Sequence, residues 1–293
     1  MNRNRNSSKK FAVVAGATGY LGRHVVKALH RDGWRVRAVA RDPSRLGESI
    51  QYCEDVVVGQ ATQIETLPGL FDDVDVAFSS IGIRSFRRRP TFDEVDYGAN
   101  AQLVDAAVRA GVRRFSFVSV LDGPQLRTLS PLVDARERVA DLLANSPIES
   151  TVLRPTGFFN DMGDVFRMAA RGKVWLIGSG NTRINPIHGA DLADVIAAAL
   201  EAPEPEPEIS VGGPEVFSQR EIGDLAFGIL GREPRYGHIS AALVRRLARW
   251  IRPLNRNASA LAMMFSSLGD RDAVAPAVGS RHLEGFFREL EAA

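Results

Sequence analysis

Residues 11–41 read FAVVAGATGYLGRHVVKALHRDGWRVRAVAR, and this stretch decides the fold. An apolar run is followed by three glycines at three-residue spacing, then by an amphipathic helical pattern and a second apolar run. The order strand, glycine turn, helix, strand is typical of a dinucleotide-binding unit. A pyrophosphate has to approach backbone N–H groups at a helix N-terminus, and side chains on the turn would block that approach. The residues predicted to contact it are Gly16, Thr18, Gly19, Tyr20, Leu21 and Gly22.

The residues after the second apolar run indicate which dinucleotide binds. An acid at this position would bind the ribose 2′-hydroxyl, whereas an arginine accommodates a 2′-phosphate. Arg41 occupies the position and Arg45 follows one helical turn later, so the sequence favours NADP(H) over NAD(H). Asp42 keeps NAD(H) open, because a strand one residue longer would bring this acid to the same position.

Composition limits the class of protein. A chain of 293 residues suits one α/β domain with an appendage. The net charge of +2 gives no general field for nucleic acid, so we expect a small-molecule substrate instead. The single cysteine, Cys53, excludes an internal disulfide and a multi-cysteine zinc site, and no cluster has metal-ligand spacing. With no signal peptide or membrane span apparent, we expect a cytoplasmic protein.

Apolar runs alternate with helical patterns as far as residue 200, which predicts a doubly wound parallel α/β sheet. Strands are expected at 11–15, 36–40, 54–59, 75–79, 114–120 and 148–153, and helices at 91–110, 132–145 and 190–200. We expect a disordered tail at 1–10, the nucleotide-binding domain at 11–200, and a mainly helical substrate cap at 201–293, interleaved with the core.

Two basic segments have more than one interpretation. Arg84–Pro90 carries four arginines and could hold an anionic substrate or phosphate, or form a solvated loop. Residues 241–252 set leucines and Trp250 against arginines. Such a helix can lie on an anionic membrane, cover a substrate pocket or contact a partner subunit, and membrane contact is the interpretation we favour least. We expect a monomer or homodimer.

Several motifs together resemble the atypical short-chain dehydrogenases/reductases, in particular their NmrA-like and divinyl-reductase-like branches. These motifs are GATGYLG at 16–22, VDYGAN at 95–100, FVSV at 117–120, LRPTGF at 153–158, and INPI at 184–187 with DLA at 191–193. The resemblance implies a Rossmann-type sheet of about seven strands with the cofactor across the strand ends. Further cofactor contacts implied by it are Ser80, Gly82, Ser119, Arg136, Pro155, Gly157 and Phe158.

The chain departs from that superfamily at its usual catalytic Tyr-x-x-x-Lys pair. Leu132 stands in the place of the tyrosine and Arg136 in that of the lysine, and no tyrosine in the chain has a lysine four residues later. Arg136 could hold a ribose hydroxyl, but it stays charged and cannot donate a proton. The remaining candidates for catalysis are Ser119, as a hydrogen-bond partner of the substrate, and His188, as a general acid.

Three functions stay open from the sequence. The first is an NADP(H)-dependent oxidoreductase that reduces a carbonyl or conjugated alkene without the usual pair. The second is a non-catalytic NADP(H)-sensing regulatory protein of the NmrA kind. The third, a nucleotide-sugar epimerase or dehydratase, depends most on the missing tyrosine and is ranked last.

Overall fold

The computed structural model describes residues 10–84, 86–267 and 269–292. The expected tail at 1–10 therefore lies outside the described residues except for Lys10. The ammonium group of Lys10 pairs with Glu201 at 3.1 Å, next to the start of the first strand.

Seven parallel strands form the central sheet, in the order β3-β2-β1-β4-β5-β6-β9. The strand order reverses between β1 and β4, which is the doubly wound arrangement whose ligands bind beyond the carboxyl ends of the strands. The predicted Rossmann-type α/β fold is confirmed. The strands are β1 (Phe11–Ala15), β2 (Arg35–Ala40), β3 (Asp55–Val58), β4 (Val76–Ser79), β5 (Arg114–Val118), β6 (Glu149–Pro155) and β9 (Glu208–Val211).

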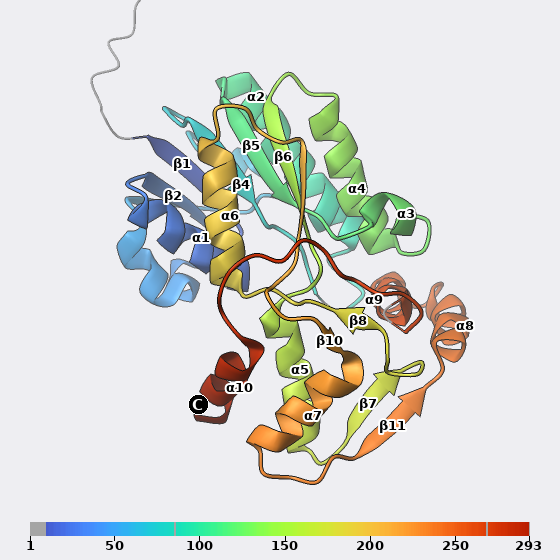
Figure 1. Ribbon diagram of the computed structural model, residues 1–293. Helices are drawn as coiled ribbons and strands as arrows, with labels where there is room; N and C mark the ends of the chain where they lie inside the picture. The colour runs from blue at the N-terminus through green and yellow to red at the C-terminus, as the bar shows by residue number, and fades with distance from the viewer. Residues whose placement is uncertain (1–9, 85, 268, 293) are drawn as a thin grey trace, which may run out of the picture.

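Helices cover both faces of this sheet (Figure 1). One buried apolar cluster joins α1 and α6 to the sheet, and a second joins α2 and α4 to the opposite face. The β1, β4 and β5 strands are buried along their length, and their residues are apolar except for Ser79, Arg114 and Ser116. These helices and the short segments between them are α1 (Tyr20–Arg31), η1 (Pro43–Tyr52), η2 (Ile64–Thr66), η3 (Asp93–Ala99), α2 (Asn100–Ala110), α3 (Gly123–Leu126), α4 (Pro131–Ala144) and α6 (Gly189–Glu201).

A second lobe lies beyond the carboxyl ends of the strands (Figure 1). Its core contains the buried rings of Phe159, Phe166, Phe227 and Phe287. Two small sheets pair β7 with β11 and β8 with β10. The elements are α5 (Phe159–Ala170), β7 (Val174–Ile177), β8 (Arg183–Ile184), β10 (Phe217–Ser218), α7 (Gln219–Ile229), β11 (Tyr236–Ile239), α8 (Ala241–Ile251), α9 (Arg256–Ser267) and α10 (Leu283–Ala292).

Segments from both sides of residue 200 contribute to each of the two lobes. The β9 strand, from the last third of the chain, pairs with β6 and covers what would otherwise be an exposed sheet edge. Conversely α5, β7 and β8 lie in the second lobe, because the apolar face of α5 packs against α7 and α10. The α5 helix and the β11 strand were not predicted from the sequence.

Candidate cofactor and substrate site

Two glycines at the turn between β1 and α1, Gly16 and Gly22, have no room for a side chain. Gly16 has a φ of +86°, and a Cβ there would lie 2.8 Å from the hydroxyl of Ser80. A Cβ on Gly22 would lie 2.6 Å from the carbonyl carbon of Gly16 and 2.8 Å from the Cα of Ala17. These distances are below any that real Cβ atoms tolerate, so the turn and the first helical turn require glycine. The backbone is consequently bare where a pyrophosphate would approach.

The N-terminus of α1 is suited to an anion. Gly19 is the capping residue and offers no side chain to the first N–H groups, and the first turn contains no acid. By contrast, Ser218 and Glu221 satisfy the equivalent groups of α7 with a capping box. The first N–H groups of any helix lack internal partners and lie at the positive end of its dipole. The residues present therefore fit a dinucleotide pyrophosphate.

Arginines surround the end of β2. Arg41 and Arg45 are both exposed there, and the guanidinium group of Arg23 donates to the carbonyl of Arg45 at 2.7 Å. Asp42 is the N-cap of η1: its carboxylate accepts from the backbone N–H of Ser44 at 3.0 Å and from the Ser44 hydroxyl at 2.7 Å. Those hydrogen bonds lower the pKa of Asp42. Asp42 thus has a structural partner, although it is exposed like Arg41 and Arg45.

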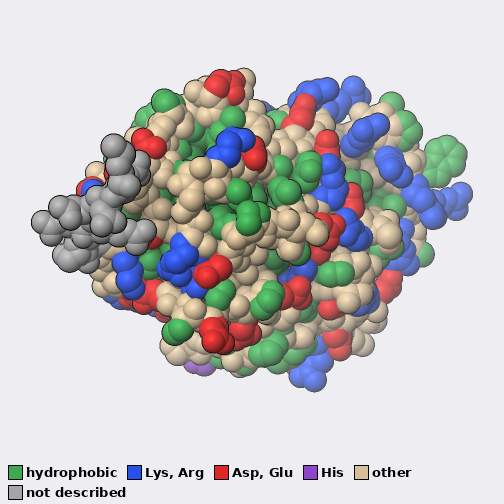
Figure 2. All heavy atoms as spheres, turned by 90° about the horizontal axis from the view of Figure 1, so that it is seen from above, with side chains coloured by type: hydrophobic (Ala, Val, Ile, Leu, Met, Phe, Trp, Pro, Cys, Tyr) green, Lys and Arg blue, Asp and Glu red, His purple; other side chains and the backbone are tan. Residues whose placement is uncertain are grey.

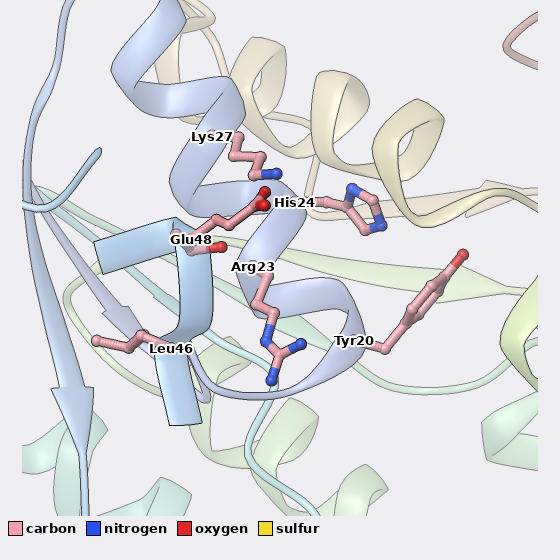
Figure 3. Close-up of a pocket in the computed structure, with 7 residues that line it drawn as sticks. Tyr20, Arg23, His24, Lys27, Leu46 and Glu48 are labelled. Carbon is pink, nitrogen blue, oxygen red and sulfur yellow. The ribbon is translucent and has the colours of Figure 1, made fainter. Parts of the chain in front are cut away.

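A cavity of about 310 Å³ lies beside this corner, between α1 and η1 (Figure 3). From α1 it is lined by Tyr20, Arg23, His24 and Lys27, and from η1 by Leu46, Glu48 and Ser49. Arg23 and Lys27 come from the exposed face of α1, which is turned away from the sheet. The cavity extends the positively charged surface along α1, away from the glycine turn.

The loop after β4 is held by Asn100. Its side-chain oxygen accepts from the hydroxyl of Ser79 at 2.5 Å, and its amide donates to the carbonyl of Ile81 at 3.1 Å. Gly82 follows, and a Cβ there would lie 2.6 Å from the carboxylate of Asp96 and still closer to the guanidinium group of Arg136. Gly82 therefore lies directly against a buried ion pair, two residues after Ser80, the other predicted contact on this loop.

Arg136, at the position expected for the lysine, belongs to that ion pair. Arg136 Nη2 lies 3.0 Å from Asp96 Oδ1, and Nη1 donates to the carbonyl of Val118 at 3.0 Å. Burial raises the pKa of Asp96 to about 6, against the opposing effect of Arg136. Leu132, in the tyrosine position, is buried with Phe92 and Leu261 in an apolar cluster under α9. This position therefore contributes packing and no proton.

Ser119 belongs to a buried network. It is 1% exposed, and its hydroxyl donates to Glu137 Oε1 at 2.5 Å. Glu137 in turn accepts from Arg154 at 2.7 and 2.9 Å, and Arg154 Nε lies 2.7 Å from Glu208. The hydroxyl of Ser119 thus faces the protein interior, and its predicted hydrogen bond to a substrate stays a prediction. The sequence did not lead us to predict this network. Glu137 follows Arg136 on the buried face of α4, and an acid on such a face indicates a buried partner.

Aromatic and histidine rings gather where α1 meets α6. Tyr20 accepts a hydrogen bond from the backbone N–H of Gly189 at 2.9 Å, and burial raises its pKa to about 12. The Phe158 ring lies 6.1 Å from the Tyr20 ring, edge to face. Of the predicted contacts, Tyr20 and Phe158 therefore meet, and Pro155 and Gly157 lie on the segment leading to them. Thr18 and Leu21 lie on the glycine turn and the first turn of α1.

His188 is the N-cap of α6. Its Nδ1 accepts from the backbone N–H of Ala190 at 3.1 Å, so the neutral ring carries its proton on Nε2. Burial lowers the pKa of His188, and burial together with His188 lowers the pKa of His24 to about 4. A role for His188 as general acid stays a prediction, and the geometry shows a capping residue.

Acidic side chains of the same chain neutralise part of the positive charge of residues 84–90, the segment that we call the arginine loop. Arg84 pairs with Asp161 and Asp164 on α5, and Arg89 pairs with Glu94. Burial raises the pKa of Asp161, which also accepts from the N–H of Phe158 at 3.4 Å. Asp161 was not singled out in the sequence, yet it brings a titratable group next to the segment that would flank a nicotinamide.

Two further observations concern the described part of the chain. It contains no group of three or more His, Cys, Asp or Glu side chains arranged to hold a metal ion. None of its helices has both the length and the apolar character to cross a bilayer. Cys53 donates to the carbonyl of Ser49 at 3.5 Å, and burial raises the pKa of its thiol to about 11.

The pattern that defines a protein family described as NAD(P)H-binding matches residues 16–203, more than half of the chain. The chain belongs to this NAD(P)H-binding family. The match begins at the first glycine of the turn and ends just beyond α6, so it spans the strand ends described above. The resemblance to the atypical short-chain dehydrogenases/reductases is confirmed.

Proteins similar in sequence to this chain include reductases. The divinyl chlorophyllide a 8-vinyl-reductase of Arabidopsis thaliana is 28% identical over 254 residues, which cover 80% of this chain and 61% of that protein. The Zea mays protein of the same name is 30% identical, with 78% and 62% covered. The ceramide reductase of Caulobacter vibrioides is 29% identical, with 76% and 71% covered. The chain thus spans about three fifths of the length of the plant relatives.

Solved structures with the same fold carry NADP(H). AtPrR2, solved with NADP+ and (+)pinoresinol, has a TM-score of 0.75 at 18% identity and covers 97% of this chain and 99% of its own. The quinone oxidoreductase QOR2 of Escherichia coli, solved with NADPH, has a TM-score of 0.72 at 19% identity and covers 96% and 99%. Likeness at this identity shows the fold alone.

The comparisons do not fix a compartment. The names of the Arabidopsis thaliana relatives include a chloroplastic and a mitochondrial protein. The cytoplasmic location expected from the sequence stays a prediction, as does a monomeric or homodimeric state.

Proposed function

We propose that this chain is an NADP(H)-dependent oxidoreductase that reduces a small or medium organic molecule at a carbonyl or conjugated alkene. The observation that carries the proposal is the N-terminus of α1, which has no side-chain cap and is flanked by Gly16 and Gly22, where no side chain fits. The reductase names among its relatives support reduction, and the word vinyl in two of them refers to a carbon–carbon double bond. When bound, the nicotinamide cofactor would supply the hydride.

The preference for NADP(H) rests on the end of β2. Arg41 and Arg45 are exposed beside the glycine turn, and Asp42 is engaged by Ser44. A guanidinium group binds a phosphate by charge-assisted hydrogen bonds, whereas a carboxylate already capping a helix is less available to a ribose hydroxyl. We assign the 2′-phosphate to Arg41 and Arg45, with Arg23 as their neighbour.

Each remaining residue has a positioning role in this proposal. Arg136 is held by Asp96 and by the carbonyl of Val118, so its positive charge stays next to Gly82. In this position it would bind the ribose. Pro155, Gly157 and Phe158 flank the nicotinamide. Leu132 stands in the place of the usual tyrosine, so the proton would come from water, from the substrate, or from a side chain such as Tyr97 or His188.

One alternative is an NADP(H)-sensing protein without turnover. It is favoured by the structural use of the positions where catalysis is expected: Leu132 packs under α9, and the hydroxyl of Ser119 is enclosed with Glu137. The epimerase or dehydratase alternative needs the tyrosine most, and it stays last. Both alternatives keep the cofactor site.

The deciding experiment is a calorimetric titration with NADPH, NADH and NADP+ in parallel, followed by a screen of enones and carbonyl compounds for oxidation of NADPH. Tight binding that prefers NADPH, with oxidation by one compound class, supports the reductase. Binding of both NADPH and NADP+ with no oxidation by any class supports the sensor. Absence of binding by all three ligands overturns the cofactor site and with it the enzyme.

A further inference from the structure

The α8 helix leaves an apolar stripe outside the protein. Only Ala241 and Ala248 of this helix are buried. Leu243, Leu247 and Trp250 follow at spacings of four and three residues, which places them on one helical face, and Trp250 is 73% exposed. Leu254 continues the stripe one turn beyond the helix and is 66% exposed. The stripe thus faces away from the core that the rest of the lobe forms.

The charge around the stripe has one sign. From residue 241 to 269 the sequence contains five arginines and no Asp, Glu or Lys. Arg245 pairs with Asp270, and the exposed arginines are Arg246, Arg249, Arg252 and Arg256. Figure 2 shows basic side chains gathered at the end of the molecule that holds α8 and α9, with apolar atoms protruding among them.

The arginine loop brings a second segment to the same surface. The side-chain amide of Asn255 donates to the carbonyl of Phe86 at 2.6 Å, and that of Asn257 donates to the carbonyls of Arg87 and Pro90, both at 2.8 Å. Phe86 is 62% exposed. The basic apolar surface, as we call it, consists of Phe86, Arg88, Leu243, Arg246, Leu247, Arg249, Trp250, Arg252, Leu254 and Arg256.

The chemistry of this surface matches an anionic bilayer. Of the eleven large apolar side chains exposed in the described part of the chain, five lie on it, so the exposure is concentrated there. A short helix with leucines and tryptophan on one side and arginines beside them inserts its apolar side chains among acyl chains, while the arginines bind lipid phosphates. Trp250 has the amphipathic ring that favours the depth of the headgroups.

A second copy of the chain fits this surface less well. In a two-fold interface the same patch meets itself, so arginine would face arginine, and Asp270, the acid paired with α8, is already engaged by Arg245. The α8 helix has 11 residues, so it can lie along a bilayer but cannot cross one. We propose that the basic apolar surface docks this protein on anionic membranes, with α8 parallel to the bilayer plane.

The test is co-sedimentation of the full chain with vesicles of phosphatidylcholine, alone or with roughly one third phosphatidylglycerol, at low and high salt. Two variants probe the surface: Arg246→Glu with Arg249→Glu, and Trp250→Ala with Leu254→Ala. Matched controls elsewhere are Arg109→Glu with Arg113→Glu, which makes the same change in net charge, and Trp175→Ala, which removes another exposed tryptophan. Circular dichroism and NADPH titration check that each variant folds.

We expect binding that requires the anionic lipid, weakens at high salt, falls at least about tenfold in both surface variants, and persists in both controls. In a Trp175→Phe background, emission from Trp250 should also shift to the blue on adding vesicles, because Trp34 is buried and unaffected. Absence of binding to the anionic vesicles, or equal loss in the controls, overturns the proposal. Self-association lost in Trp250→Ala, without vesicle binding, overturns it in favour of a dimer interface.

Discussion

Arg136 on α4 and Asp96 on η3 form a buried ion pair next to Gly82, with Nη2 of the arginine 3.0 Å from Oδ1 of the acid. The usual lysine of the superfamily would lie at Arg136 and would work with a tyrosine, yet here the position carries a permanent charge with its own counter-ion. The structure thus holds a cation, with a partner acid, at the position predicted to contact the ribose.

The ion pair predicts a pH dependence of stability. Because burial raises the folded-state pKa of Asp96 from 3.8 to about 6, the fold favours the protonated acid. This contribution to stability is present below pH about 4 and is lost as pH rises through 6, by about 3 kcal/mol. Urea unfolding between pH 4 and 8 should therefore show this decline in the wild type relative to Asp96→Asn. Parallel profiles would contradict the prediction, and Asp93→Asn, on the same helix, is the exposed control.

Arg41 should discriminate between the cofactors. Removal of a charge-assisted hydrogen bond in Arg41→Ala should weaken NADPH binding by about 1.5–3 kcal/mol and leave NADH binding unchanged. Calorimetry measures both affinities. Arg31→Ala, an exposed arginine at the other end of α1, is the control. Equal losses for NADPH and NADH would show that Arg41 does not read the 2′-phosphate.

Gly22 should tolerate no side chain. In Gly22→Ala the new Cβ would contact the backbone of Gly16 and Ala17, so we expect a loss of roughly 1–3 kcal/mol in unfolding free energy together with weaker NADPH binding. Gly228→Ala on α7 meets nothing within 4 Å and should instead stabilise the protein by up to about 1 kcal/mol. Thermal unfolding compares the two, and similar effects would contradict the close packing of the turn.

The network around Ser119 should matter for stability. Glu137 is buried and pairs with Arg154, so Glu137→Gln should cost about 3 kcal/mol, the low end for a broken buried pair, because the half-exposed Glu208 still pairs with Arg154. The exposed pair of Asp105 and Arg109 gives the comparison, since Asp105→Asn should cost no more than about 0.5 kcal/mol. Denaturant unfolding of both variants decides, and a small effect at Glu137 would mean that water satisfies Arg154.

His24 should lower stability in acid. Burial and the neighbouring His188 lower its pKa from 6.5 to about 4, so the fold favours the neutral ring. This contribution is complete above pH 6.5 and is lost as pH falls towards 4. Since the ring is only partly buried, we expect about 1–2 kcal/mol. His24→Gln should flatten the unfolding profile over this range. An unchanged profile, or the same change in His238→Gln on β11, would refute the assignment.

Sequence reasoning predicted the parts of the site that depend on neighbouring residues. The glycine spacing at 16–22, the strand before it and the helix after it all lie within one short window, as does Arg41 at the end of β2. Asp161 and the helix α5 were missed, because their partners Arg84 and Phe287 are distant in the sequence. The ion pairs of Arg84 with Asp161 and Asp164 were missed for the same reason.

The sequence by itself determined the doubly wound sheet and the glycine turn, because each is written in residue types at short spacing. Only the tertiary structure decided the surroundings of the candidate catalytic positions: Asp96 beside Arg136, Glu137 between Ser119 and Arg154, and Leu132 under α9. It also placed Phe86 beside α8. The packing of helices against the sheet determines which residues surround a buried charge or apolar group. These residues are far apart in the chain, so the local helix and strand periodicities do not predict their contacts.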